Sequence, residues 1–438
     1  MTRYKKWIRL LLIGVFVAVG APMAYRGAPI VRERESYRSF FPKEKFQERL
    51  KKPAAPWMEE QVAQDLAVFQ KVSASSVEKT YSRMVEVLGP LEPIYHFRIL
   101  GNKLYKYVPE GAPFSDTDTR IEKALKTLLL YAKVPDIDFV LCGLDGVPEH
   151  YFPSDFYLTG DPLTQAPVFA QAKRENIATQ YIVLIPDQLC LSDLWFQGSQ
   201  EELQSIPWDQ KAAVAIWRGG LSDAGEPNAG QFIDSFAKTP RFALCKIGAE
   251  HPDVIDAGFA GLDCEEMEAL MQKLGLGKPP LSKRAHLRGK YLPVLDGHMC
   301  TYPGYQWRLL SNSVCLKQES DQVQWFYKAL KPYIHYIPVQ NDMRDLVEKI
   351  NWAKEHDEEA AQIAANAHAF ASQNLLFEDV YFYLHFALCE YAKRQKMDFQ
   401  ALKQETRRDP HWKCIQYRKR LGLEKSVARL KHKIRNLL

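Results

Sequence analysis

The fold is decided by a stretch that begins Lys290-Tyr-Leu-Pro-Val-Leu-Asp-Gly297, continues Thr301-Tyr-Pro-Gly-Tyr-Gln-Trp-Arg308 and ends Ser313-Val-Cys-Leu-Lys-Gln-Glu-Ser320. Its apolar runs at 291–295 and 314–317 are typical of buried strands. Pro303 stands where proline is common, in the first turn of a helix. A strand, a helix and a second strand in this order predict two parallel strands joined by a helical crossover.

The same alternation extends on both sides of this stretch. Further apolar runs typical of strands lie at 137–142, 168–172, 181–185, 212–217 and 242–247. Segments with helical periodicity lie at 231–237, 265–274, 322–330, 343–355, 358–375 and 377–396. The sequence therefore predicts an α/β fold with two facing Rossmann-like domains, divided near Ile206-Pro-Trp208, and helices at the C-terminal end.

The region before the alternation has its own signals. A β-hairpin is predicted at 94–108, with its turn at Gly101-Asn102. A helix is predicted at 116–133, with Ser115 as its N-cap. Residues 60–88 have helical spacing, and the charged, proline-containing residues before them resemble a stalk.

The N-terminus carries a pattern that is typical of membrane targeting. Arg3, Lys5, Lys6 and Arg9 precede an apolar run at 10–24. We expect a signal sequence or an uncleaved single-pass anchor, because residues 7–24 have about the minimum length that spans a bilayer; the alternative is a buried helix. An anchor would leave the N-terminus in the cytoplasm by the positive-inside rule, although Arg32 and Arg34 weaken that orientation.

The positive charge is concentrated at the C-terminal end. The 438 residues have a formal net charge of +5, yet residues 407–435 alone have a net charge of +9. These basic residues alternate with Trp412, Ile415 and later apolar residues, as in helices that lie on a membrane surface; the alternative is a solvated basic extension. Because the rest of the chain is slightly acidic and carries no recognition motif, we expect no nucleic-acid partner. The eight cysteines form no CxxC pair and predict neither a zinc site nor a disulfide framework.

Polar residues follow four of the predicted strands, where α/β sheets bind ligands. Asp145 comes directly after the strand at 137–142, between two glycines. A carboxylate there suits a general base, and the alternative is an ordinary turn aspartate. Trp217-Arg-Gly-Gly220 closes another strand, where Arg218 and backbone amides would approach an anion together. The alternative is a surface arginine in a glycine turn.

The third group follows the strand at 291–295. It comprises Asp296-Gly297, the loop through Thr301, and the start of a helix that would bind diphosphate, with Arg308 a turn later. Lys317 and Glu319 end the next strand. The alternatives are a buried helix with a solvated arginine and a solvated loop, and His335 is expected to be a packed histidine. No GxGxxG or Walker pattern supports adenine nucleotide binding, and no acid pair at a strand end indicates a catalytic metal or other cofactor.

These segments resemble the capsule-associated-protein family of glycosyltransferases, which includes Rumi-type protein O-glucosyltransferases, their KDEL-containing relatives and bacterial lipopolysaccharide-modifying enzymes. The resemblance rests on 290–297, 313–320, His335-Tyr-Ile-Pro-Val339, and Pro207-Trp208 leading into Trp217-Arg-Gly219. The later text Trp352-Ala-Lys-Glu-His-Asp-Glu-Glu-Ala-Ala361, Phe370-Ala-Ser-Gln-Asn-Leu375 and Asp379-Val-Tyr-Phe-Tyr383 is similar as well. The resemblance extends from about residue 136 to residue 396.

The family implies a GT-B architecture and an inverting, metal-independent transfer from UDP-glucose, UDP-xylose or a similar donor. It implies that Asp145 is the catalytic base. Pro167-Val-Phe-Ala-Gln-Ala-Lys173 resembles a segment near donor and acceptor, which makes Lys173 and Phe169 candidates. The donor-binding candidates are Trp217, Arg218, Gly219, Ser222, Asp296, Gly297, Thr301, Tyr302, Gly304, Arg308, Ser313, Lys317 and Glu319.

Two departures from the family pattern concern the donor. Gly304 stands where the family's phosphate-binding arginine is expected, nine residues before Ser313, so either Arg308 substitutes for it or phosphate is held differently. The polar residues expected after Trp217-Arg-Gly219 are replaced by Gly220-Leu-Ser222, which leaves the donor sugar open. The absence of the eukaryotic cysteine framework favours a glycan or a lipid-linked acceptor, such as lipopolysaccharide, over a protein.

The resulting hypothesis is a membrane-associated glycosyltransferase. Its rival is a catalytically inactive sugar-nucleotide-fold protein that binds or assembles at a membrane. The expected organisation is a membrane segment at 1–28, a stalk and helical region at 29–90, an acceptor-side domain at 91–205, a donor domain at 206–360, helices at 361–400 and a basic tail at 401–438.

Overall fold

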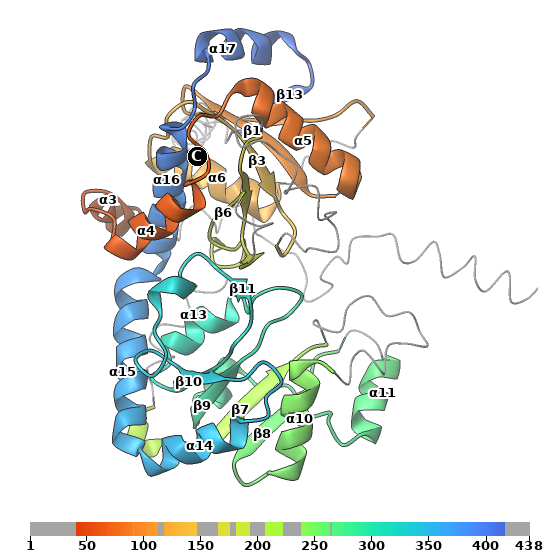
Figure 1. Ribbon diagram of the computed structural model, residues 1–438, viewed down its shortest axis with the longest axis vertical. Helices are drawn as coiled ribbons and strands as arrows, with labels where there is room; N and C mark the ends of the chain where they lie inside the picture. Colours follow the sequence, from red (N-terminus) through yellow and green to blue (C-terminus); the bar gives the residue numbers. More distant parts are fainter. Residues whose placement is uncertain are drawn as a thin grey trace, which may run out of the picture. The chain divides into compact units, whose positions relative to one another are not determined.

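Two large β-sheets with helices against them, and a small two-stranded sheet, make up the part of the chain that the structure describes (Figure 1). The structure is a computed structural model that describes residues 41–90, 92–111, 118–146, 165–175, 181–192, 206–221, 238–262 and 265–416. Both sheets belong to one compact unit, Pro42–Leu438. The α/β class predicted from the sequence is confirmed.

The first sheet has six strands in the order β13-β2-β1-β3-β4-β6. The strands β3, β4 and β6 are parallel to one another, whereas β1 and β2 form the antiparallel hairpin that the sequence predicts. Every residue of β3 is buried, as expected of a strand covered on both faces. Its strands are β1 (Ile94–Leu100), β2 (Lys103–Tyr107), β3 (Ile137–Cys142), β4 (Val168–Ala170), β6 (Ile182–Leu184) and β13 (Trp412–Cys414).

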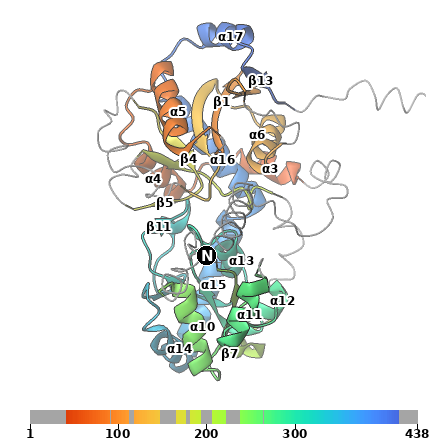
Figure 2. The same ribbon diagram turned by 90° about the vertical axis from the view of Figure 1, so that its right-hand side faces the viewer.

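Helices from both ends of the described chain cover the first sheet. Helices α5 and α6 lie on either side of β1 in Figure 2. Each begins with a capping box, at Ser73 and at Thr119, in which the cap side chain and the third helical residue satisfy each other's backbone amides. The helices are α3 (Lys43–Arg49), α4 (Pro56–Asp65), α5 (Ala74–Leu88), α6 (Arg120–Tyr131), α16 (Phe377–Ala392) and α17 (Phe399–Arg408). The predicted cap Ser115 lies outside the described residues, and α6 begins five residues later.

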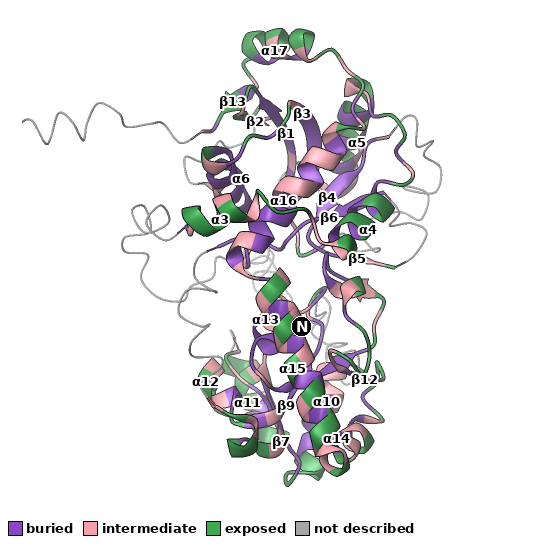
Figure 3. Cartoon of the chain, turned by 90° about the vertical axis from the view of Figure 1, so that its left-hand side faces the viewer, coloured by how far each residue is buried: buried purple, intermediate pink, exposed green. Residues whose placement is uncertain are grey.

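The second sheet is entirely parallel and has the order β12-β10-β9-β7-β8. Its strands are β7 (Ala212–Gly219), β8 (Ile255–Phe259), β9 (Gly289–Val294), β10 (Val314–Gln318) and β12 (Ile337–Val339). The helices of this part are α10 (Pro240–Glu250), α11 (Glu265–Lys273), α12 (Lys283–His286), α13 (Gly304–Leu309), α14 (Leu346–Glu355) and α15 (Asp357–Asn374), with 3-10 turns at Trp208–Gln210 and Tyr327–Ala329. Apolar residues from the strands and from α10, α11, α14 and α15 form one continuous core, and β9 is almost entirely buried (Figure 3).

Two local predictions are wrong. The segment 242–247 is not a strand but the middle of α10, which starts with Thr239 as N-cap and Pro240 in the first turn. The segment 322–330 is not a helix, because Gln322–Val323 forms strand β11, which pairs with β5 (Lys173–Arg174). The predicted helix at 231–237 lies outside the described residues.

The C-terminal part also differs from the prediction. Trp412 and Ile415, expected on a membrane-binding helix, are buried against the first sheet because β13 pairs with β2. The residues after 416, and the predicted membrane segment at 1–28, lie outside the described part of the chain. Among the described residues, no helix combines the length and the apolar character needed to cross a bilayer.

Candidate functional site

The loops after the parallel strands of the two sheets meet. Gly146, in the loop after β3, lies so close to the loop after β9 that a Cβ there would be 2.8 Å from the Met299 side chain. Ala172, Met299 and Cys300 form a small buried cluster against which Tyr302 packs. Strands β5 and β11 pair beside it, visible in Figure 2. The carboxyl ends of parallel strands are where such sheets bind ligands, so both ligand-binding edges face one place.

Asp145 is the exposed acid of this junction. It follows β3 directly, and its side chain is open to solvent whereas the preceding strand is buried. Among the described residues it has no hydrogen-bond or ion-pair partner. The structure thus brings the predicted base next to the predicted donor loop. The sequence places each of them at the end of a strand, but it does not show that the two strand ends meet.

Asp296 is the buried acid of the junction, at the end of β9. Only 4% of it is exposed, and its Oδ1 has no hydrogen-bond partner among the described residues. Its Oδ2 accepts a hydrogen bond from Ser320, and burial raises the pKa of Asp296 while Lys317 opposes the rise. A carboxyl with an unused buried acceptor is costly unless a ligand or water completes it.

Two cations lie around this acid. Arg241, near the start of α10, donates to the carbonyl oxygens of Asp296 (2.8 Å) and Gly220 (2.9 Å). Lys317 is buried, donates to the Gln318 carbonyl at 2.5 Å, and has no ion-pair partner among the described residues. Sequence reasoning missed Arg241, because the segment was assigned to a strand; the Thr239-Pro240 pair was the available signal for a helix start.

The Arg308 side chain packs against the backbone of Gly304. It is 6% exposed, its Nη1 donates to the Gly304 carbonyl at 2.9 Å, and its Nε has no hydrogen-bond partner in the part of the chain that the structure describes. A Cβ on Gly304 would lie 2.8 Å from that Nη1, so the glycine leaves the room that the guanidinium fills. Burial lowers the pKa of Arg308 to about 10. A buried cation with an unused donor, and with no carboxylate partner within the described ranges, suits an anionic ligand.

Tyr302 and Asp187 add two more polar groups without partners. The Tyr302 hydroxyl and Asp187 Oδ2 are buried and make no hydrogen bond among the described residues. Burial raises the pKa of Tyr302 well above its usual value, and Asp145 adds most among its charged neighbours. Burial also raises the pKa of Asp187, which follows β6 and was missed because the sequence does not reveal how the two sheets meet.

Arg218 is not the free cation that the sequence analysis expected. Its guanidinium pairs with Asp256 at 3.0 and 3.2 Å and donates to the Pro279 carbonyl. Lys278 holds the same carboxylate at 2.7 Å. Trp217 is buried in the core against Phe259, and Gly219 is required there because a Cβ would lie 2.4 Å from the Trp217 ring.

Ser313 lies at the opposite edge of the sheet, before β10 rather than after it. Its hydroxyl donates to the Gly289 carbonyl and accepts from Lys211 at 2.9 Å. Burial lowers the pKa of Lys211 to about 8. These contacts tie the amino ends of neighbouring strands together, so the geometry separates Ser313 from Asp296.

Lys173 and Phe169 have structural surroundings in the first part of the fold. Lys173 forms a buried ion pair with Asp65 of α4 at 2.5 Å and donates to the Ile182 carbonyl. Phe169 is fully buried and packs edge-on against Phe139 and Tyr391. These contacts give both side chains a structural role, and a role beside donor or acceptor stays a prediction.

The remaining candidates flank the junction. Gly297 and Thr301 lie in the loop between β9 and α13, where the Gly297 amide donates to the Met299 carbonyl and the Thr301 hydroxyl to that of Leu295. Glu319 is exposed after β10. Ser222 lies outside the described residues. Within the described ranges, no group of three or more His, Cys, Asp and Glu side chains could hold a metal ion.

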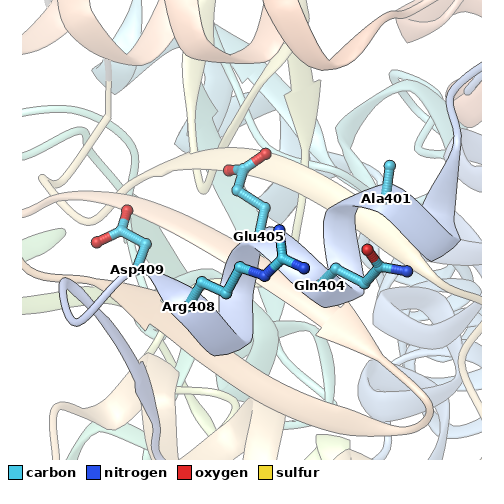
Figure 4. Close-up of a pocket in the computed structure, with 5 residues that line it drawn as sticks. All are labelled: Ala401, Gln404, Glu405, Arg408 and Asp409. Atoms are coloured by element: carbon cyan, nitrogen blue, oxygen red, sulfur yellow. The ribbon is translucent and has the colours of Figure 1, made fainter.

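A surface hollow of about 490 Å³ lies elsewhere, along α17 (Figure 4). It is lined by residues of that helix and its end, among them Gln404, Glu405 and Arg408. None of the groups described above lies in it, and polar side chains on one outer helix offer no enclosed site.

Comparison with known proteins identifies the family of this chain. The family model described as glycosyl transferase family 90 matches residues 51–430. The chain belongs to this family. Protein O-glucosyltransferase 3 of Homo sapiens is 28% identical over 351 residues, which cover 78% of this chain and 63% of that protein. Protein O-glucosyltransferase 2 of Danio rerio is 26% identical, covering 76% and 62%.

The chain thus spans less than two thirds of the length of these curated relatives. Among solved structures, Anabaena Alr3699/HepE in complex with UDP is similar at 13% identity with a TM-score of 0.39, covering 56% of this chain and 70% of that chain. The complex of the same protein with UDP-glucose has 15% identity and a TM-score of 0.36, with the same coverage.

Proposed function

We propose that this chain is a glycosyltransferase of the GT-B type that moves a hexose or pentose from a UDP-sugar to a hydroxyl group. The observation that carries the proposal is the meeting of the Asp145 loop with the loop 296–302. This juxtaposition sets an exposed carboxylate beside buried cations and unpartnered polar groups. Family membership and the names of the curated relatives support the same reaction class.

In the proposed reaction, Asp145 takes the proton from the acceptor hydroxyl as that oxygen attacks C1 of the donor sugar. The bond between C1 and the β-phosphate oxygen breaks on the opposite face, and its electron pair leaves with UDP. Attack opposite the leaving group inverts the anomeric carbon. No metal takes part in this proposal.

The leaving diphosphate needs positive charge that is already in place. Arg241, Lys317 and Arg308 lie around the carboxyl end of β9 and would supply it. Fixed cations in a site from which water is excluded stabilise developing charge without reorganisation. The donor is a UDP-sugar of the glucose or xylose type, and the acceptor is a glycan, a lipid-linked sugar or a protein hydroxyl.

Membrane attachment is part of the same proposal. It rests on the basic and apolar pattern of residues 1–28 and on the basic residues after 416. The rival function is binding without catalysis, and it predicts that UDP binds but no sugar is transferred.

A donor screen distinguishes the two. The purified chain is incubated with UDP-glucose, UDP-xylose, UDP-galactose and UDP-N-acetylglucosamine, with glycan, lipopolysaccharide and peptide acceptors, and products are read by mass spectrometry. We expect transfer from one of the UDP-sugars. UDP binding without transfer to any acceptor class would favour the non-catalytic protein, and absence of UDP binding would exclude both.

A further inference from the structure

The backbone around Asp145 is held by side chains on both sides of it. The Gly143 carbonyl accepts a hydrogen bond from Gln188 Nε2 at 2.8 Å, and the Leu144 carbonyl accepts one from Gln171 Nε2 at 2.7 Å. The Gly146 carbonyl accepts from the Cys142 thiol at 3.7 Å. Three carbonyls next to the exposed carboxylate therefore each have a side-chain donor.

The two glutamines come from different loops and are bonded to each other. Gln171 follows β4 and Gln188 follows β6. The backbone N–H of Gln188 donates to the side-chain oxygen Oε1 of Gln171 at 2.9 Å. Gln171 is 4% exposed, so both ends of its amide are used in a buried place. Because only nitrogen donates and only oxygen accepts, its amide can satisfy both partners in one orientation.

A buried carboxyl fixes the loop that carries the second glutamine. Asp187 Oδ1 accepts from the backbone amides of Leu189 and Cys190 at 3.0 and 2.9 Å. This turn holds Gln188 at its apex. The position of Asp145 thus depends on three loops of one sheet edge, each contributing one residue to a continuous chain of hydrogen bonds.

We propose that Gln171 and Gln188 are positioning residues, which hold the Asp145 backbone so that its carboxylate reaches the acceptor hydroxyl. The inference rests on the proposed function of Asp145 as the base. An aspartate side chain is short, so the place of its carboxylate follows closely from the place of its backbone. Neither glutamine touches the substrate in this account.

The expected effect is on the rate of transfer and not on donor binding. Removing either amide leaves a half-buried backbone carbonyl, that of Leu144 or Gly143, without its side-chain donor, and the loop relaxes. A displacement of about 1 Å at a catalytic group lowers rate by up to about 100-fold. The cations that hold UDP belong to the other sheet and keep their places.

The test compares Gln171→Ala, Gln171→Glu and Gln188→Ala with the wild-type chain. Gln362→Glu is the matched control, because Gln362 lies exposed on α15. UDP release from the donor found in the screen gives kcat and KM, calorimetry gives the Kd of UDP, and urea unfolding gives stability. We expect the three variants to lose about 10-fold to 100-fold in kcat, with the KM of the donor and the Kd of UDP within about twofold of wild type.

The Gln171→Glu variant supplies a readout that a purely structural role does not move. The carboxyl group that this substitution introduces can donate to the Leu144 carbonyl when it is protonated, and it cannot when it is ionised. The ratio of kcat between this variant and wild type should therefore rise as pH falls, whereas the Gln171→Ala ratio stays flat. Taking the ratio to wild type removes the pH dependence that the two proteins share.

The outcomes separate the two proposals. Unchanged kcat in the alanine variants, an equal loss of UDP affinity, or a Gln171→Glu ratio that does not change with pH would overturn the positioning role while leaving Asp145 as the base. A wild-type chain that transfers no sugar, or an Asp145→Asn variant with full transfer, would overturn the proposed function and this inference with it.

Discussion

Replacing Gly304 by alanine should weaken UDP binding more than it weakens the fold. An added Cβ would lie 2.8 Å from Arg308 Nη1 and 2.8 Å from the Thr301 methyl, whereas ordinary contacts begin at 3.4 Å. The guanidinium must then move by roughly 0.6 Å, because the Thr301 side chain closes the other direction. The hydrogen bond from Arg308 to the Gly304 carbonyl, now 2.9 Å, lengthens or breaks.

The displaced group is the end of a flexible side chain, so the cost to the fold is small. We expect about 1 kcal/mol less stability from this local overpacking. The loss in UDP affinity should be about 10-fold or more, since a charged hydrogen bond is worth roughly 1.5–3 kcal/mol. Calorimetric titration with UDP and urea unfolding measure the two quantities separately.

Gly220→Ala is the matched control, because no atom of the described residues lies within 4 Å of a Cβ at Gly220. It should keep both stability and UDP affinity. The double variant Gly304→Arg with Arg308→Ala moves the guanidinium from position 308 to position 304. It should restore part of the UDP affinity that Arg308→Ala loses. Wild-type UDP affinity in both Gly304→Ala and Arg308→Ala would refute Arg308 as a phosphate ligand.

Three further predictions concern two side chains that are held in ion pairs, Lys173 and Arg218, and one that is buried, His286. Lys173→Met leaves the Asp65 carboxylate buried without its partner and should cost about 3–5 kcal/mol in urea unfolding, whereas a Kd for UDP changed more than twofold would contradict its structural role. Arg218→Ala should cost only about 1 kcal/mol, because Asp256 is 38% exposed and screened by solvent, and it should leave UDP affinity unchanged; a tenfold weaker affinity would return Arg218 to the donor site. Burial lowers the pKa of His286 from 6.5 to about 4, so the unfolded chain binds the extra proton and stability should fall as pH falls from 6.5 to 4, by up to about 3 kcal/mol; the His286→Asn variant should lack this part of the pH dependence, and equal slopes in both proteins would contradict it.

The sequence predicted the strands well where their signal is local. The continuous apolar run that forms β3 is the clearest case, and the hairpin of β1 and β2 follows from the Gly101-Asn102 turn. Segment 242–247 misled because its apolar residues are as compatible with a helix as with a strand. Segment 322–330 misled because Val323 pairs with Lys173, and no local pattern reports a partner so far away.

Some residues of the candidate site likewise have a local sequence signal, and others do not. Asp145 and Asp296 could be picked out because each directly follows a strand. Arg218 was equally well placed in the sequence, yet Asp256 on the neighbouring strand neutralises it. Gln171 and Gln188 have no sequence signal, since their roles arise only where three loops come together.

The central claim is that Asp145 is the base for transfer from a UDP-sugar. Its most direct test is the Asp145→Asn variant, which keeps the size of the side chain and the backbone contacts and removes only the ability to take a proton. Sugar transfer and the Kd of UDP are measured on the same preparation. We predict that kcat falls by about 100-fold to 10,000-fold while the Kd of UDP stays within about twofold of wild type. Transfer at the wild-type rate would contradict the account.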